Sequence, residues 1–286
     1  MRNTQHPILN TVIKELMIEK RIGIIGCGNM GEAILARLSE KLEKSTMIMV
    51  SEFDAARRDY IFGKYKIIVA VDNNLVVKNS DVIIIAVKPK DVDALLRNEI
   101  AIGASRKKLI ISIAAGVTTK RIESIIGKDV PVIRMMPNMP AIIGRGISSL
   151  SAGKAAKKDD IDAAREIFST IGDVVEIDEK FVDAVTAVSG SGPAYFFYLM
   201  EAMTEAAENM GIPAEAAKKL VLKTAVGGAL LAEHLGEKPA ALRAKVSSAG
   251  GTTEAAIKVL EAKRFKAIVK AAIKEACKRS KKLSKA

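Results

Sequence analysis

Cysteine, histidine and tryptophan are nearly missing from this chain of 286 residues, which has two cysteines, two histidines and no tryptophan. Cys27 and Cys277 are too few for a disulfide framework, so we expect a reducing compartment and a cytoplasmic location. His6 and His234 stand without any clustered Cys/His spacing, which argues against zinc, so we expect no metal.

Long apolar runs are also missing. None reaches the roughly 18 residues that a membrane span needs, so we expect no membrane partner. Residues 1–20 do not read as a signal peptide, because charged residues such as Lys14 and Glu19 interrupt any apolar core. We treat 1–20 as an N-terminal extension without an assigned function, and Met17 is an alternative start.

Aromatic residues are scarce, at 4%, although the net charge is +12. A basic chain raises the question of nucleic-acid binding. The lysines are spread out, often on helices of alternating charge, without aromatic interleaving or a known binding signature. We therefore expect no nucleic-acid partner, and only a general attraction of anionic substrate and cofactor.

Residues 21–177 alternate apolar runs with helical patterns. Several runs are short and continuous, as expected for strands covered on both faces. The predicted strands are 22–25, 47–50, 66–69, 82–87, 109–114, 130–135, 146–150 and 174–177. Helices are predicted at 54–62, 91–99, 118–126 and 157–171, with another after the first strand. This alternation predicts an α/β domain of the Rossmann type, with a doubly wound, largely parallel sheet.

The character of the sequence changes at residues 178–286, which are rich in Ala, Glu, Lys, Leu and Met and have almost no strand signal. The predicted helices are 179–190, 193–210, 213–235, 238–245, 253–261 and 263–282. The third of these is apolar over a broad arc, which favours burial against a partner subunit. We therefore predict an all-helical C-terminal domain that binds substrate and forms a homodimer.

The first predicted strand runs directly into a glycine loop with the pattern G-x-G-x-x-G, and a helical pattern follows. The loop reads Gly26-Cys27-Gly28-Asn29-Met30-Gly31. Gly26 makes the tight turn, Gly28 admits a pyrophosphate, and Gly31 lets helix and strand pack closely. The strand–loop–helix context makes this a strong prediction of dinucleotide binding.

Two signals near the second strand disagree about the cofactor. Glu52 ends that strand, where an acidic side chain reaches the ribose hydroxyls and repels a 2′-phosphate, which favours NADH. Arg57 and Arg58 follow within about a turn, and either is able to bind that phosphate. The predicted cofactor is therefore NADPH or NADH.

A second glycine loop lies late in the chain, directly before a helical pattern. It reads Val246-Ser247-Ser248-Ala249-Gly250-Gly251-Thr252-Thr253. Glycines let the backbone approach a ligand, and the free N–H groups of a helix start attract an anion. The loop therefore predicts a site for a small carboxylate, in which the threonines add hydroxyls; capping of the helix is the structural alternative.

The ends of the fourth, fifth and sixth predicted strands also supply residues that could bind a ligand at the edge of the sheet. Ala86-Val87-Lys88-Pro89 ends the fourth strand, and Ala114-Ala115-Gly116 closes the fifth with small residues that let a nicotinamide ring approach. Asn138 stands between two prolines after the sixth strand. Its amide could point at a ligand or form a structural turn, and the sequence favours neither interpretation.

These motifs, in this order, resemble the pyrroline-5-carboxylate reductase family over residues 21 to about 280. The most specific are the segment from Asp183 to Tyr195, which contains Ser-Gly-Ser-Gly-Pro, and the Ser-Ser-Ala-Gly-Gly-Thr-Thr stretch. The family usually has proline in place of Ala249, which leaves this loop less rigid, and often glycine in place of Ala256.

The resemblance implies hydride transfer from NAD(P)H to the C=N bond of Δ1-pyrroline-5-carboxylate, which yields L-proline. It implies that Ser248, Gly250, Gly251 and Thr252 bind the substrate, and that Thr253 both binds it and serves as the catalytic proton donor, unless a water does so. It also implies that Asn73, Ala115 and residues 86–89 contact the cofactor together with the glycine loop and Glu52. A homodimer, or a larger assembly of dimers, follows from the same resemblance.

Two other functions remain open at this point. Enzymes of the β-hydroxyacid dehydrogenase type have the same architecture, but they commonly use a lysine and an asparagine on the interdomain helix. This chain has no lysine between Phe181 and Lys218, which disfavours a carbonyl substrate. A non-catalytic regulator that binds a nicotinamide nucleotide would leave the second glycine loop without a role.

Overall fold

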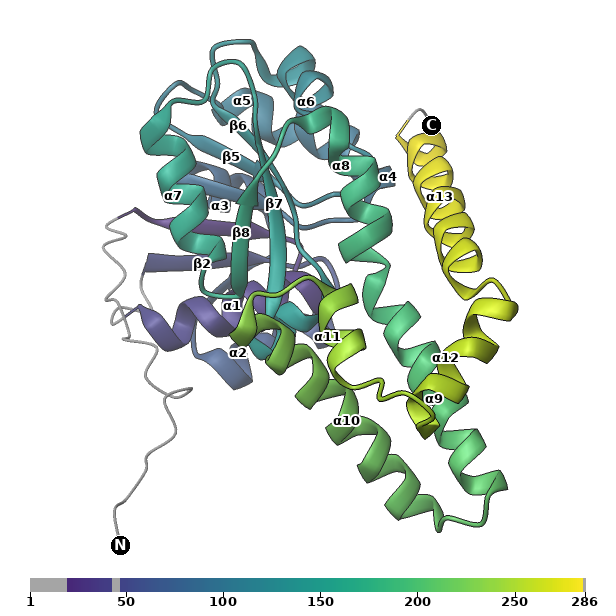
Figure 1. The fold of residues 1–286 in the computed structure, drawn as a ribbon. Helices are drawn as coiled ribbons and strands as arrows, with labels where there is room; N and C mark the ends of the chain where they lie inside the picture. Colours follow the sequence, from purple (N-terminus) through teal and green to yellow (C-terminus); the bar gives the residue numbers. More distant parts are fainter. Residues whose placement is uncertain (1–19, 43–46, 285–286) are drawn as a thin grey trace, which may run out of the picture. The chain divides into compact units, whose positions relative to one another are not determined.

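The structure of the chain is a computed structural model that describes residues 20–42 and 47–284. The chain divides into two compact units, which we describe separately (Figure 1). The first runs to Val182 and takes in the chain end from Leu283, and the second spans Asp183–Lys282. The predicted extension, residues 1–20, lies outside the described residues except for Lys20. The domain ranges given above stay a prediction.

The first unit is built on an eight-stranded sheet whose order is β3-β2-β1-β4-β5-β6-β7-β8. The strands are β1 (Ile22–Ile25), β2 (Ile48–Ser51), β3 (Ile68–Ala70), β4 (Val82–Ile85), β5 (Leu109–Ser112), β6 (Val132–Met136), β7 (Gly146–Ala152) and β8 (Gly172–Glu176). Neighbouring strands are parallel except for β6 and β7, which are antiparallel. The predicted doubly wound, largely parallel sheet is confirmed.

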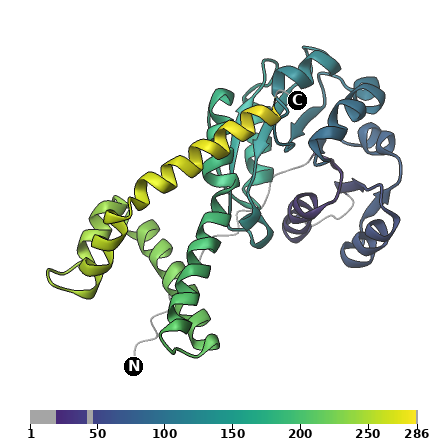
Figure 2. The same ribbon diagram turned by 90° about the vertical axis from the view of Figure 1, so that its right-hand side faces the viewer.

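Helices cover both faces of this sheet (Figure 2). They are α1 (Asn29–Lys41), α2 (Ala55–Tyr65), α3 (Asn73–Asn79), α4 (Pro89–Leu95), η3 (Leu96–Ile100), α5 (Ala101–Gly103), α6 (Thr119–Ile126), η4 (Met139–Ile143), α7 (Lys158–Phe168) and η5 (Glu179–Phe181). Residues of α1, α2 and α7 pack in one apolar cluster, and residues of α3, α4 and α6 pack in the other. All four residues of β4 are fully buried between the two clusters, which explains why the strand is a continuous apolar run.

The sequence analysis missed α3 and misplaced the start of α4. Helix α3 has only seven residues, of which Val76 and Val77 are buried, so it is too short to show a helical period. Helix α4 begins at Pro89, two residues before the predicted start, because proline suits the first helical position.

The second unit is entirely helical, as predicted. It contains α8 (Val182–Val185), η6 (Thr186–Gly190), α9 (Gly192–Asn209), α10 (Ala214–Leu235), α11 (Pro239–Lys245), α12 (Thr252–Ala262) and α13 (Phe265–Leu283). The helix predicted at 179–190 is helical throughout, and it consists of the 3-10 helix η5, the α-helix α8 and the π-helix η6 in succession. Arg264 adopts a positive φ of 57° and separates α12 from α13.

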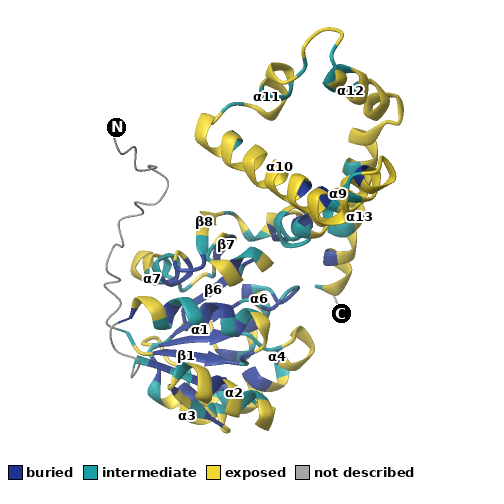
Figure 3. Cartoon of the chain, turned by 90° about the horizontal axis from the view of Figure 1, so that it is seen from below, coloured by how far each residue is buried: buried dark blue, intermediate teal, exposed yellow. Residues whose placement is uncertain are grey.

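The long helices of the second unit are largely exposed (Figure 3), and many of their exposed residues are large and apolar. Tyr198 of α9 is 74% exposed, and Val226, Leu230 and Leu231 of α10 are also exposed. Exposed apolar surface on this scale indicates a face that binds another protein surface. Within the part of the chain that the structure describes, no helix has both the length and the apolar character needed to cross a membrane.

Candidate active site

The predicted cofactor residues meet at the carboxyl edge of the sheet. The register pairs Ile25 with both Ser51 and Ile85, and pairs Ile85 with Ser112. The strands β2, β1, β4 and β5 therefore end at one level. The strand order reverses between β1 and β4, and in open α/β sheets ligands bind in the crevice at such a switch point.

The glycine loop between β1 and α1 has the shape that a pyrophosphate needs. Gly26 has a φ of +88°, and a Cβ added to Gly31 would lie 2.3 Å from the Gly26 carbonyl oxygen, so both positions require glycine. A Cβ added to Gly28 would meet nothing within 4 Å, which leaves the loop open on that side. Helix α1 starts at Asn29 without a side-chain cap, so its first N–H groups suit a phosphate. The residues present fit a dinucleotide.

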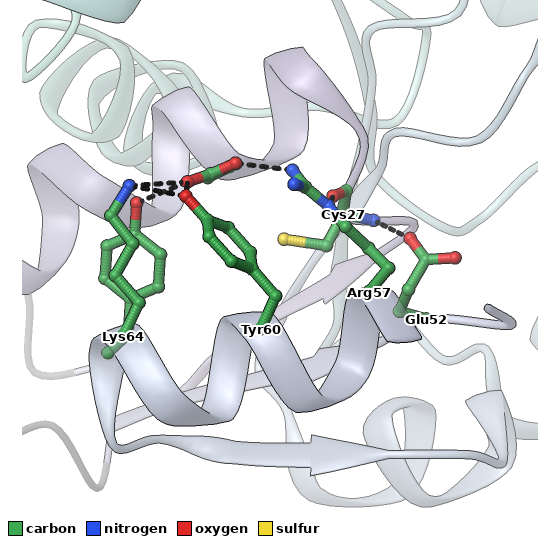
Figure 4. Close-up of polar contacts among 7 residues, drawn as sticks. Cys27, Glu52, Arg57, Tyr60 and Lys64 are labelled. Atoms are coloured by element: carbon green, nitrogen blue, oxygen red, sulfur yellow. Dashed lines mark hydrogen bonds and ion pairs between the residues drawn. The ribbon is translucent and has the colours of Figure 1, made fainter. Parts of the chain in front are cut away.

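The peptide groups of Cys27 are held from both sides by residues that follow β2 (Figure 4). The Cys27 N–H donates to Glu52 Oε2 at 2.8 Å, and Arg57 Nε donates to the Cys27 carbonyl oxygen at 2.8 Å. Glu52 Oε1 also accepts from the Asp54 N–H at 3.1 Å. Burial raises the pKa of the Cys27 thiol to about 12, so this cysteine is a packed, unreactive part of the loop.

Glu32, in the first turn of α1, binds four side chains of α2. Its carboxylate accepts from Arg57 Nη2 at 2.5 Å, Lys64 Nζ at 2.9 Å, the Tyr65 hydroxyl at 2.8 Å and the Tyr60 hydroxyl at 3.2 Å. Burial opposes ionisation, but the hydrogen bonds from Lys64, Tyr65 and Arg57 outweigh it and lower the pKa of Glu32 to about 2. The sequence analysis missed Glu32, although it directly follows the last glycine of the loop.

Both arginines that were predicted as alternative ligands of a 2′-phosphate have hydrogen-bond partners within the protein. Arg57 binds Cys27 and Glu32, and Arg58 Nη1 donates to the Glu52 and Phe53 carbonyl oxygens at 3.0 and 2.6 Å. Phe53, which the sequence analysis also missed, is 95% exposed beside the strand end. Its signal in the sequence is an aromatic residue directly after the acidic one.

The remaining predicted cofactor residues lie at the ends of β3, β4 and β5. Ala86 and Val87 are half-buried, Lys88 is the exposed N-cap of α4, and Pro89 is its first residue. Half-buried Ala115 lies in the turn after β5, and Asn73 begins α3 after β3. The structure thus gathers all of these positions on one sheet edge, together with the glycine loop and Glu52.

Asn138 has a structural role in the turn between β6 and β7. Its side-chain oxygen accepts from the Ile147 N–H at 3.0 Å, which ties η4 to the start of β7. Of the two interpretations of Asn138, the structure therefore supports the turn.

The Gly250–Thr253 loop belongs to the second unit and leads into α12. Gly250 has a φ of +72°, a conformation that favours glycine, and a Cβ on Gly251 would lie 2.6 Å from the Ser248 hydroxyl oxygen. Gly251 is the N-cap, and no side chain caps α12, so the threonines do not act as caps. Thr252 is exposed and Thr253 half-buried in the first turn.

A carboxylate already binds one amide of this loop. The Gly250 N–H donates to Glu254 Oε2 at 2.6 Å, and Lys258 Nζ lies 2.9 Å from Glu254 Oε1. The hydrogen bonds from Lys258 and from the Gly250 N–H lower the pKa of Glu254. This contact indicates that the loop amide is positioned to bind a carboxylate.

Two family models match the chain. Residues 179–283 match the model for pyrroline-5-carboxylate reductase dimerisation, and residues 21–116 match the model for NADP oxidoreductase, coenzyme F420-dependent. A relative from Synechocystis named pyrroline-5-carboxylate reductase is 43% identical over 266 residues, which cover 93% of this chain and 98% of the relative. The chain belongs to the pyrroline-5-carboxylate reductase family.

Solved structures of pyrroline-5-carboxylate reductases agree with this assignment. One from Coxiella burnetii is 35% identical with a TM-score of 0.88, and the match covers 93% of this chain and 99% of that one. Another, from Plasmodium falciparum with NADP bound, is 28% identical with a TM-score of 0.84, over 93% and 98% of the two chains. The predictions of family, fold class and an NAD(P)H-dependent oxidoreductase are confirmed.

The family assignment sets aside the two alternatives, a β-hydroxyacid dehydrogenase type of enzyme and a non-catalytic regulator. The described residues contain no group of three or more His, Cys, Asp or Glu side chains that could hold a metal ion. No metal ligand set is therefore assigned to the chemistry discussed below.

Proposed function

We propose that this chain reduces Δ1-pyrroline-5-carboxylate to L-proline with NAD(P)H, the last step of proline biosynthesis. The observation that carries the proposal is the match to a pyrroline-5-carboxylate reductase at 43% identity over 93% of the chain. The glycine loop geometry supports it, because Gly26, Gly28 and Gly31 fit a dinucleotide.

We assign the cofactor to the carboxyl edge of the sheet. The glycine loop, Gly26 to Gly31, holds the pyrophosphate through the amides at the start of α1, because the Gly26 and Cys27 N–H groups already donate to Ser51 and Glu52. Glu52 also accepts from the ribose hydroxyls. Asn73, Ala86 to Pro89 and Ala115 line the same edge, and the small side chains at Ala86 and Ala115 leave room for the nicotinamide. Phe53, exposed beside Glu52, stacks on the adenine. When bound, the cofactor supplies the hydride.

The second glycine loop holds the substrate in this proposal. The amides of Gly250 to Thr253 bind the carboxylate, with Ser248 and Thr252 beside them, and the Glu254 carboxylate leaves the Gly250 N–H when substrate binds. The hydride adds to the C=N carbon and the ring nitrogen gains a proton. The Thr253 hydroxyl donates that proton or a hydrogen bond to the ring nitrogen. A ring imine protonates readily, so positioning provides most of the rate.

We also propose a homodimer formed through the second unit, with larger assemblies of dimers as an extension. The match of residues 179–283 to a dimerisation model and the exposed apolar side chains of α9 and α10 support the dimer. A cytoplasmic location agrees with the two unpaired cysteines, Cys27 and Cys277. Membrane and nucleic-acid partners are not part of the proposal.

Oxidation of reduced cofactor tests the function directly. The purified full chain is mixed with NADH or NADPH and either Δ1-pyrroline-5-carboxylate, a 3-keto acid or no substrate. We expect oxidation only with the cyclic imine, with L-proline formed in equal amount. Oxidation that requires a 3-keto acid would instead indicate a dehydrogenase for carbonyl substrates.

A further inference from the structure

Glu32 binds Arg57, one of the two arginines that follow Glu52 at the end of β2. We propose that Glu32 determines the choice between NADH and NADPH, because it binds Arg57 and so keeps this cation from a 2′-phosphate. Glu52 is then left to accept from a ribose that carries only hydroxyls, and the chain favours NADH. This inference rests on the proposed function only in taking a nicotinamide dinucleotide as the ligand.

Arg57 and Glu52 contact the same residue of the glycine loop. Glu52 accepts from the Cys27 N–H, and Arg57 donates to the Cys27 carbonyl oxygen, each at 2.8 Å, so both side chains reach the same residue of the glycine loop. In this fold the acid that ends the second strand contacts the 2′-hydroxyl, and an arginine nearby accommodates a 2′-phosphate. Arg57 is thus the candidate for that phosphate.

The contacts of Arg57 occupy one whole edge of its guanidinium. Nε donates to Cys27 O, and Nη2 donates to Glu32 Oε2 at 2.5 Å. A guanidinium binds a phosphate best through two parallel N–H groups, and the Nε–Nη2 edge is one of the pairs that it offers. The Arg57 side chain is 28% exposed and that of Glu32 17%, so water screens this pair only in part. A 2′-phosphate would have to compete with Glu32 for Arg57.

Three further side chains of α2 hold Glu32 in place beside Arg57. Lys64, Tyr60 and Tyr65 all donate to its Oε1, and the Arg57 guanidinium lies 5.1 Å from the centre of the Tyr60 ring (Figure 4). Its place in the first turn of α1 adds the favourable field of the helix N-terminus. Glu32 therefore remains an anion at neutral pH and bridges α1 to α2.

Two other cations of α2 are engaged as well. Arg58 donates to the Glu52 and Phe53 carbonyl oxygens, and Lys64 donates to Glu32 and to the Tyr60 hydroxyl. A 2′-phosphate at this edge would therefore meet the carboxylate of Glu52, while Arg57 and Lys64 are paired with Glu32 and Arg58 is held through Nη1 by two carbonyl oxygens. The preference for NADH therefore comes from repulsion of a 2′-phosphate as well as from hydrogen bonds to an unphosphorylated ribose.

Binding of NAD⁺ and NADP⁺ to the full chain, measured by calorimetry without substrate, tests this role. The measured quantity is the ratio of the NADP⁺ Kd to the NAD⁺ Kd in wild type, Glu32→Gln, Arg57→Met and the double variant. Wild type is expected to have a ratio above one. Glu32→Gln should lower the ratio by about tenfold, as expected for one charge-assisted hydrogen bond gained by the phosphate. The double variant should return to the wild-type ratio, because the released arginine is then missing.

Arg57→Met alone should weaken the binding of both cofactors together and leave the ratio within about twofold of wild type, a change well below one such hydrogen bond. An increase of the ratio in Arg57→Met would show that Arg57 already binds the 2′-phosphate, and would overturn the inference even if Glu32→Gln failed to fold. An unchanged ratio in a folded Glu32→Gln variant would also overturn it. Because no turnover is measured, a chain that binds NAD⁺ but does not reduce the imine would contradict the proposed function and leave this test intact.

Discussion

At the scale of single residues, the structure raises the question of which group donates the proton that reaches the ring nitrogen. Thr253→Val keeps the β-branched shape in the first turn of α12 and removes only the hydroxyl. If that hydroxyl assists the nitrogen, kcat should fall by about ten- to a thousandfold, while the affinity for cofactor stays unchanged. Thr252→Val is the matched control and should mainly raise the substrate KM. Wild-type turnover in Thr253→Val would assign the proton to water.

Glu254 gives a second prediction at this scale. Its carboxylate binds the Gly250 N–H that we assign to the substrate carboxylate, and its charge repels that group. Glu254→Ala should therefore lower the KM for Δ1-pyrroline-5-carboxylate several-fold, with little change in kcat, in steady-state assays. Lys258→Met, which removes the partner of Glu254 and keeps the carboxylate, should not lower the KM. A higher KM in Glu254→Ala would mean that Glu254 shapes the loop for the substrate.

The residues that the sequence could reveal are those fixed by local geometry. Gly26, Gly28 and Gly31 are set by one turn, and Glu52 by the end of one strand, so spacing alone predicts them. The role of Glu32 depends on Arg57, Lys64 and other α2 side chains that lie far along the chain and reach it only after α1 and α2 have packed on the sheet. No periodicity in the sequence signals such a contact.

At the scale of helices and strands, features fixed by local sequence could also be predicted, and features that depend on long-range packing could not. All eight strands of the described sheet were predicted because each is an apolar run bounded by turns. The register that brings Gly26, Glu52 and Ala86 to one level is a property of strand pairing, and it follows from the sequence only once a parallel sheet is assumed. Short elements such as α3 and α5 have too few residues to show a helical period.

The bridge between α1 and α2 makes stability depend on pH. The folded pKa of Glu32 is about 2, below its ordinary value of 4.5, so the unfolded chain binds more protons between these values. The stabilisation from Glu32 is complete above about pH 4.5 and is lost as the pH falls toward 2. Glu32→Gln should therefore lower the Tm at pH 6, and the difference from wild type should shrink at pH 3.

Thermal unfolding followed by circular dichroism at the two pH values measures this difference. Asp59→Asn serves as a control for the removal of one carboxylate, because Asp59 is exposed on α2 and is not part of the contacts of Glu32. A difference between Glu32→Gln and wild type that grows toward pH 3 would contradict the assigned charge state of Glu32.

At the scale of the whole molecule, the exposed apolar side chains of α9 and α10 support the proposed homodimer. Leu230→Glu places a charge on the exposed apolar side of α10 and should convert a dimer into monomers in light scattering. Ile102→Glu changes an exposed apolar residue of the first unit, on α5, and should leave the assembly unchanged. A dimer that survives Leu230→Glu would move the interface away from this face.

In the proposed reaction, a hydride passes from the nicotinamide to the C=N carbon of the cyclic imine. The most direct measurement uses NADH carrying deuterium at the transferred position of C4, with mass spectrometry and NMR of the product. We expect L-proline with one deuterium on the ring carbon that was double-bonded to nitrogen in the substrate. Oxidised cofactor without labelled proline, or deuterium at any other carbon, would contradict it.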